Sequence, residues 1–162
     1  MRYYLLLLLL LSTLLLNACT RGVATAAPPE IRYGEDTCTE CNMIISDPRY
    51  AAGYAHELST GRYESLAFDD IGDLLAHLEK HRERKVVAWY VHDYTTAEWL
   101  DATTAYYVLS DEIHSPMGHG IAAHATRDAA EVLVQNKSGL VLDWQGLQAH
   151  VKATAGHSDH SH

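Results

Sequence analysis

The spacing of apolar residues in the first half of the chain predicts two strands, a helix and a third strand. The strands are expected over residues 50–58 and 62–68, because β-forming side chains recur on either side of a Ser-Thr-Gly turn. Asp69 or Asp70 can then cap a helix. Apolar residues at helical spacing mark one face of that helix: Ile71, Leu74, Leu75 and Leu78. The apolar run 86–91 is typical of a strand inside a sheet.

The second half of the chain predicts the same order of elements. Strands are expected over 103–109, 121–124 and 140–142, and helices over 127–135 and 144–153. Thr126 and Asp143 stand where N-caps are needed. The order strand, strand, helix, strand therefore occurs twice, over about 50–91 and 103–142. Strands outnumber helices, and there are too few helices for a doubly wound sheet, so the pattern indicates the α+β class.

The N-terminus has the pattern of a secretion signal. Arg2 precedes a leucine run from Leu5 to Leu11, and the apolar stretch 3–18 is short for a membrane-spanning helix. An uncleaved anchor helix is the alternative. The tetrad Leu16-Asn17-Ala18-Cys19 resembles a bacterial lipobox, which implies a signal peptide over 1–18 and lipidation of Cys19. The protein would then be extracytoplasmic, anchored to the outer membrane or to the outer face of the plasma membrane.

Two segments outside the predicted elements are polar and poor in large apolar residues. Residues 19–35 contain small residues and a Pro-Pro pair, and are predicted to be the lipid anchor and its tether. Residues 154–162 are predicted to be a polar, histidine-rich tail. The folded domain is thus expected over 36–153.

The charge of the chain is acidic. Its formal net charge of −9 becomes −10 once Arg2 leaves with the signal peptide. Nucleic-acid binding depends on Lys and Arg contacts to phosphate, so this composition argues against a nucleic-acid partner. An acidic surface favours cations or basic surfaces of other proteins.

The segment Cys38-Thr39-Glu40-Cys41-Asn42-Met43 carries three sulfur atoms within six residues. Thiolate and thioether are soft donors that select Cu(I), whereas thiolates alone also suit zinc. The sequence has no second Cys-x-x-Cys pair for a four-cysteine zinc site, and no histidine follows Cys41 as haem attachment requires. A local disulfide between Cys38 and Cys41 remains an alternative in an oxidising compartment.

A second candidate metal-binding segment is the loop Ser115-Pro116-Met117-Gly118-His119-Gly120. A methionine flanked by glycine in a loop is poorly explained as a core residue. Met117 offers another soft donor, and His119 offers an imidazole or is simply a solvated loop residue. Among the scattered histidines, His56 and His124 lie in predicted strands and merit a test.

Taken together, these segments resemble the NosL family, which comprises lipoprotein accessory factors for nitrous oxide reductase. The resemblance covers residues 33–135 and begins with the signature from Asp36 to Asp47. Four further blocks follow in order: Phe68-Asp69-Asp70-Ile71-Gly72, His92-Asp93-Tyr94 with Trp99, Tyr106-Tyr107-Val108, and Ser115 to Gly120. The family's fold is expected to contain two related ββαβ modules, an arrangement shared with an organomercurial lyase.

The resemblance implies a Cu(I) chaperone rather than an enzyme. Cys41 and Met43 match the family's Cys-x-Met, and Met117 matches its loop methionine. Cys38 and His119 are the candidates to complete the site. The implied partner is a copper-receiving enzyme or its assembly complex, in the nitrous oxide reductase machinery.

Two other functional classes remain open. The first is a thiol enzyme that uses Cys38 and Cys41 for redox chemistry or for cleavage of a carbon–mercury bond. Such cleavage needs a carboxylate, for which the sequence offers Asp69 or Asp70, although helix capping explains that pair more simply. The second is a structural zinc-binding module, which would lose its fold in a chelator.

Overall fold

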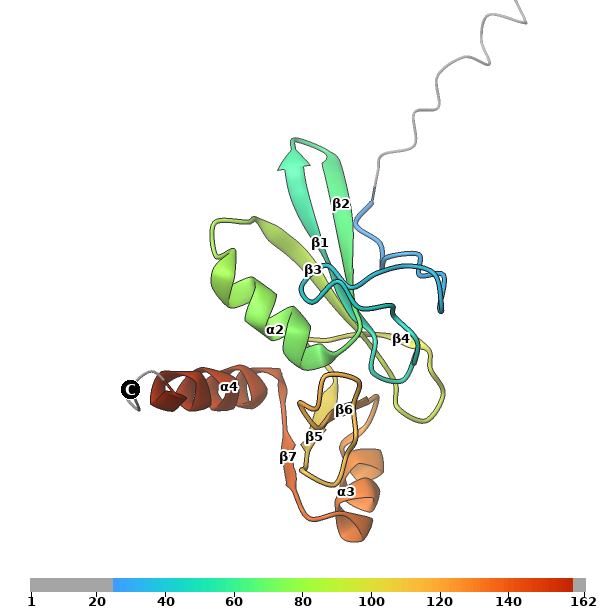
Figure 1. Ribbon diagram of the computed structural model, residues 1–162, viewed down its shortest axis with the longest axis vertical. Coiled ribbons are helices and arrows are strands. Elements are labelled where there is room, and N and C mark those ends of the chain that lie inside the picture. The colour runs from blue at the N-terminus through green and yellow to red at the C-terminus, as the bar shows by residue number, and fades with distance from the viewer. Residues whose placement is uncertain (1–24, 159–162) are drawn as a thin grey trace, which may run out of the picture.

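The structure is a computed structural model that describes residues 25–158 (Figure 1). The predicted signal peptide, Cys19 and the last residues of the predicted tail lie outside the described residues. Among the described helices, none combines the length and the apolar composition needed to cross a membrane.

The first module is a four-stranded antiparallel sheet with one helix. It comprises β1 (Ala52–Ser59), β2 (Arg62–Phe68), α2 (Ile71–Lys80), β3 (Val86–His92) and β4 (Trp99–Asp101). The strands lie in the order β2-β1-β3-β4, and α2 packs beside the sheet (Figure 1). Strand β2 is therefore an edge strand, and α2 connects it to β3, which pairs with the other side of β1.

The second module has the same topology on a smaller scale. It comprises β5 (Tyr106–Leu109), β6 (Ile121–His124), α3 (Arg127–Asn136) and β7 (Leu140–Leu142), followed by α4 (Trp144–Ser158). Its strands lie in the order β6-β5-β7, all antiparallel, so the first strand is again the central one. The predicted α+β class with two ββαβ modules is confirmed.

The predicted bounds agree best where turns or caps delimit an element. Strands β2, β6 and β7 begin and end at the predicted residues, and Asp70 and Thr126 cap their helices as expected. Strand β1 begins two residues later than predicted and β5 three residues later. Strand β4 was not predicted, because three residues carry no periodic pattern and pair only through contact with β3.

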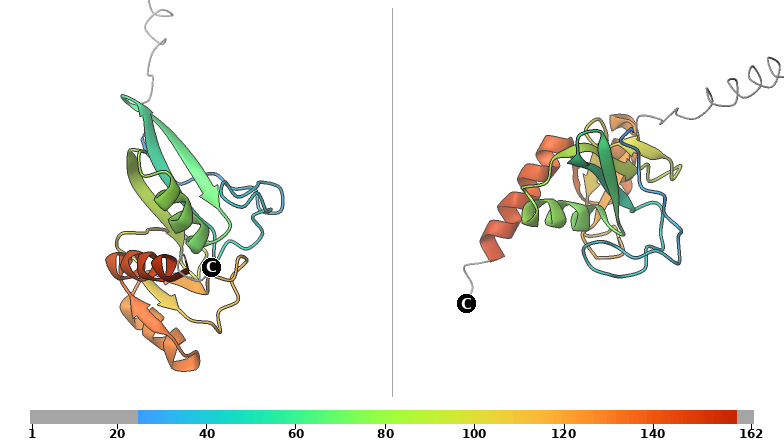
Figure 2. Two further views of the ribbon diagram at one scale, coloured as in Figure 1. Left: turned by 60° about the vertical axis from the view of Figure 1, so that its left-hand side comes forward. Right: turned by 90° about the horizontal axis from the view of Figure 1, so that it is seen from above.

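One apolar core connects the two modules. Its buried members come from the segment before β1 and from strands and helices of both modules, and they include Ile45, Tyr54, Phe68, Ile71, Leu74, Tyr107, Ile121, Trp144 and Leu147. A parallel backbone bridge between Asp93 and Ala123 also joins the end of β3 to β6. Helix α2 contacts β6, and two turned views show α2 beside the second module (Figure 2).

The fold extends into both segments that were predicted to be a tether and a tail. The tether was predicted over 19–35, yet Pro29 is buried and lies over Gly53, where an added Cβ would come within 2.5 Å of its ring. The Ser65 hydroxyl donates a hydrogen bond to the Ala27 carbonyl at 2.6 Å. At the other end, α4 continues through Ser158. Folded structure therefore begins before residue 36 and continues past residue 153.

Two histidines that are not among the candidate metal ligands are buried in the sheets. His92 is 3% exposed, and its Nδ1–H donates to the Ala51 carbonyl at 3.0 Å. His124 is 2% exposed, and neither ring nitrogen has a hydrogen-bond partner among the described residues. Burial lowers the pKa of both rings below the ordinary value. Both are therefore neutral in the folded protein at pH 7. His56 differs, because its Nε2 meets Glu64 at 2.9 Å.

We expect the free energy of unfolding to fall as the pH drops below about 6.5, where an unfolded histidine takes up its proton. The buried rings resist protonation, so the unfolded state binds more protons, and each histidine adds a slope of at most about 1.4 kcal/mol per pH unit. Urea unfolding at pH 7.5 and 5.5 measures this loss. It should shrink in His124→Leu and persist in His114→Gln, which changes an exposed ring. An equal loss in His124→Leu would contradict the assignment.

Candidate metal centre

The segment from Cys38 to Met43 forms a tight loop that precedes β1. The Cys38 N–H donates to the Met43 carbonyl at 2.8 Å, and the Asn42 N–H donates to the Cys38 carbonyl at 3.0 Å. Asn42 takes a left-handed conformation, with φ of 60°, which asparagine tolerates better than most residues. The Thr39 N–H donates to the Ala67 carbonyl at 2.9 Å, which ties the loop to the end of β2.

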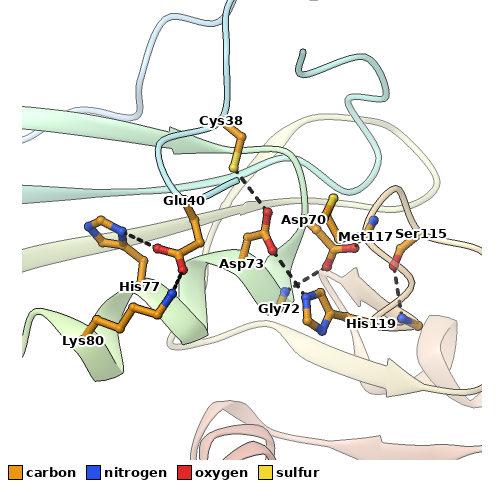
Figure 3. A network of polar contacts seen from close by, with 11 residues as sticks. Cys38, Glu40, Asp70, Gly72, Asp73, His77, Lys80, Ser115, Met117 and His119 are labelled. Carbon is orange, nitrogen blue, oxygen red and sulfur yellow. Dashed lines mark hydrogen bonds and ion pairs between the residues drawn. The ribbon is translucent and has the colours of Figure 1, made fainter. Parts of the chain in front are cut away.

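Glu40, between the two cysteines, docks the loop on α2 (Figure 3). Its carboxylate accepts a hydrogen bond from His77 Nδ1 at 2.9 Å and pairs with the Lys80 ammonium. Burial works to raise the pKa of Glu40, but the hydrogen bonds from Lys80 and His77 outweigh it and hold the pKa below its usual value. Burial lowers the pKa of His77, so at pH 7 a neutral ring donates this hydrogen bond to Glu40.

Two thiols and one carboxylate gather at the start of α2. The sulfurs of Cys38 and Cys41 and a carboxylate oxygen of Asp73 all lie within 4.8 Å of one another. The Cys38 thiol donates to Asp73 Oδ2 at 3.3 Å. Cys38 is fully buried, Cys41 is partly exposed, and both thiols are free. Burial and then the hydrogen bond with Asp73 raise the pKa of Cys41 to about 12, so its thiol is protonated at pH 7 until a metal displaces the proton.

The loop of the second module meets the same turn of α2. The Met117 N–H donates to Asp70 Oδ2 at 3.1 Å, while Asp70 Oδ1 caps α2 by accepting from the Gly72 N–H at 2.8 Å. His119 Nε2 lies 3.3 Å from Asp73 Oδ1. Asp70 and Asp73 therefore connect the first turn of α2 to both candidate loops (Figure 3).

Gly72 is required for this convergence. The His119 ring lies directly against it, and a Cβ added at Gly72 would be 2.1 Å from the His119 Cγ. That contact is far too short, and the obstacle is the base of a ring rather than the end of a flexible chain. The block Phe68-Asp69-Asp70-Ile71-Gly72 thus combines a helix cap with a position that admits the second loop.

The structure brings three of the five predicted ligands together around Asp73, while the other two are exposed methionines on the adjoining loops. Cys38, Cys41 and His119 gather around Asp73. Met43 is 57% exposed and Met117 is 39% exposed, each on a loop that reaches the cluster. Coordination of a metal by these five residues stays a prediction.

Asp73 is the site residue that sequence reasoning missed. An acid in the first turn of a helix also favours the helix dipole, so its residue type alone does not indicate a site. Helical spacing gave no signal either, because it places Asp73 on the face opposite Ile71 and Leu74, where an acid is expected to be exposed. In the structure Asp73 is buried. Of the two carboxylates considered beforehand, Asp69 accepts the Ser46 N–H at 3.2 Å and Asp70 caps α2.

Comparison with known proteins decides the family. The sequence profile of the NosL family matches residues 31–151, which is most of the chain. The chain belongs to the NosL family. The resemblance inferred from the sequence blocks is thereby confirmed.

Two individual proteins are also similar to this NosL-family chain. The copper-binding lipoprotein NosL of Stutzerimonas stutzeri is 26% identical over 146 residues, which cover 85% of this chain and 75% of the relative. The crystal structure of the copper chaperone NosL from Shewanella denitrificans aligns with a TM-score of 0.63 at 19% identity. That alignment covers 75% of this chain and 96% of the other, and it supports the α+β fold. Both names describe metal binding or delivery rather than catalysis.

Proposed function

We propose that this NosL-family chain is a Cu(I) carrier that loads and releases the ion at the start of α2. Cys38 and Cys41 supply thiolates, Met43 and Met117 supply thioethers, and His119 is the candidate for a further donor. The observation that carries the proposal is the pair of free thiols within 4.8 Å of each other and of Asp73. Exposed methionines on both adjoining loops support it.

The donor set favours Cu(I) over harder ions. Thiolate and thioether ligands select Cu(I), while imidazole and carboxylate also suit other metals. Asp73 contacts the Cys38 thiol, and it is the acceptor nearest to the proton that this thiol loses when the metal binds. Binding at the two cysteines thus exchanges the thiol protons for the ion.

Release is proposed to occur by ligand exchange through the exposed side of the site. Cys38 is buried and held by Asp73, so it is the fixed donor. Met43 and Met117 are accessible to a partner, whose own soft donors can replace them one at a time. No bond in a substrate is made or broken, so the chain is proposed to act as a carrier and not as an enzyme.

The proposed location rests on the N-terminal sequence and on the name of one relative, and the proposed partner rests on the family resemblance. A lipid on Cys19 would hold the domain on the outer membrane facing the periplasm, or on the outer face of the plasma membrane. The lipobox-like tetrad supports this, as does the name of the Stutzerimonas stutzeri relative, a lipoprotein. The proposed recipient is nitrous oxide reductase, its assembly complex, or a related copper enzyme.

The grouping of two thiols with a carboxylate also favours a second candidate function, that of an enzyme that cleaves carbon–mercury bonds. Cleavage of a carbon–mercury bond uses two thiolates to hold mercury and an acid to protonate the departing carbon. Cys38, Cys41 and Asp73 place those groups within 4.8 Å. The thiol protons and the Asp73 carboxylate would supply the proton that converts the organic group to a hydrocarbon, leaving Hg(II) on sulfur.

Anaerobic competition against a coloured Cu(I) chelator tests these alternatives on the purified chain. The carrier proposal expects one tightly bound Cu(I) per chain, with Zn(II) unable to displace it. Tighter binding of Zn(II), together with unfolding in a chelator, would replace the proposal with a structural zinc site. Release of methane from methylmercury would replace it with the mercurial enzyme.

A further inference from the structure

A second set of metal donors lies at the other end of α2, on the far side of Glu40 from the thiols. His77 is in the last turn of α2, and His81 is its C-cap residue. The His81 N–H donates to the His77 carbonyl at 3.0 Å, so the helical spacing continues between them. Residues four apart on a helix share a face. The two ring centres lie 4.2 Å apart, with the planes tilted by 36°.

Each ring presents its Nδ1 to a carboxylate. His77 Nδ1 meets Glu40 at 2.9 Å, and His81 Nδ1 faces Glu83 at 3.4 Å. Histidines that bind metals commonly have the non-coordinating nitrogen held in this way, which orients the ring and makes the other nitrogen a better donor. In both rings Nε2 is therefore the nitrogen available to an ion.

The Nε2 atom of His77 is a buried polar atom whose hydrogen bonding is unsatisfied by the described residues. The His77 side chain is 5% exposed, and its Nε2 is buried without a hydrogen-bond partner among the described residues. A buried polar atom of this kind is costly and calls for a partner. It points away from Glu40 (Figure 3), and the ring of His81, whose side chain is 36% exposed, lies next to it.

We propose that His77 and His81 form a second metal site, which takes a divalent transition-metal ion of the Zn(II) or Cu(II) class through the two Nε2 atoms. Two histidines at this helical spacing are a known arrangement for Zn(II). Imidazoles without thiolates favour these divalent ions over Cu(I). His81 turns to uncover Nε2 of His77 as the ion enters, and water completes the coordination. Leu78 occupies the position where zinc hydrolases carry their glutamate base, so the site binds and does not hydrolyse.

Glu40 connects this site to the thiol loop. Its carboxylate orients His77, and its backbone lies between Cys38 and Cys41. An ion on His77 strengthens the bond from Nδ1 to Glu40, because coordination makes the N–H more acidic. Occupation of the histidine site therefore holds the Cys38–Met43 loop more firmly on α2.

The test uses the full-length chain with Cys19→Ala, Cys38→Ala and Cys41→Ala, so that no thiol competes for the metal. His157, His160 and His162 are also changed to Gln, because the terminal histidines can bind the same ions. Cu(II) is added to one equivalent and followed by electron paramagnetic resonance, with Zn(II) affinity measured by competition. We expect one bound ion with hyperfine structure from two nitrogens. His81→Gln should weaken Zn(II) binding by about tenfold or more, while the exposed control His114→Gln leaves it unchanged.

Equal Zn(II) affinity in the parent and in His81→Gln would overturn the proposal, as would a Cu(II) spectrum without nitrogen coupling. His81 is the variant of choice, because its ring is partly exposed and its loss spares the core around His77. If the cysteine variants do not fold, the wild-type thiols are first saturated with Cu(I) without oxygen. Zn(II) is then added, and failure of His81→Gln to reduce its binding would also overturn the proposal.

Discussion

Replacing Cys41 by serine is expected to lower the affinity for Cu(I) by at least about 100-fold. Loss of an outer-shell partner alone typically costs 10- to 100-fold in metal affinity, and a lost thiolate ligand costs more. A serine hydroxyl is a hard, weakly acidic donor that does not replace thiolate for Cu(I). Anaerobic competition against a Cu(I) chelator measures the change.

The fold should survive this substitution, which makes the result interpretable. Cys41 is partly exposed, whereas Cys38 is fully buried in the main core and accepts less change. Thr39→Ala is the matched control, because Thr39 is exposed in the same loop and its anchoring contact is made by its backbone N–H. We expect Thr39→Ala to keep wild-type affinity. Affinity within about threefold of wild type in Cys41→Ser would remove Cys41 from the ligand set.

The second large effect is expected at Asp70, where alanine should reduce the free energy of unfolding by about 3 kcal/mol. Loss of an N-cap costs about 1 kcal/mol, and loss of a hydrogen bond to a buried charged group costs about 1.5–3 kcal/mol. Asp70 is fully buried and accepts both the Gly72 and Met117 N–H groups. Urea unfolding measures the loss.

Asp143→Ala separates the cap from the contact between loops. Asp143 Oδ1 accepts the Gly146 N–H at 2.7 Å in the first turn of α4, but it is exposed and holds no second loop in the described contacts. It should cost about 1 kcal/mol. The same stability loss in both variants would show that the Met117 bond contributes nothing. We also expect Asp70→Ala, and not Asp143→Ala, to weaken Cu(I) binding, because Met117 loses its anchor.

Local sequence patterns predicted most of the fold because each depends on near neighbours. The β-forming residues in 62–68 indicate a strand, and the stripe of Ile71, Leu74 and Leu75 indicates one buried helix face. Asp70 and Thr126 mark helix starts because they cap their own first turns. Where an element depends on a distant partner, the prediction was wrong or incomplete. Strand β4 exists because Leu100 pairs with Val91, and the described end of the predicted tether is fixed because Pro29 packs on Gly53.

For the candidate site, too, one part could be predicted from the sequence and another could not. The identity of the soft donors could be predicted, since sulfur chemistry is a property of Cys38, Cys41, Met43 and Met117 themselves. Their common support could not be predicted. The Cys38–Asp73 contact spans 35 positions, and the Met117–Asp70 contact spans 47. No local period relates residues so far apart.

The sequence by itself determined the order of the elements, the α+β class, the acidic charge and the kinds of donor atoms, because each is written in residue type or short-range spacing. Only the tertiary structure decided that one turn of α2 receives both loops, that Asp73 joins the two thiols, and that Gly72 makes room for His119. It also decided that His77 is left with a buried, unpartnered nitrogen. These features arise because two modules pack on one core. Packing brings together residues that are far apart in the sequence, and local spacing along the chain does not reveal such pairs.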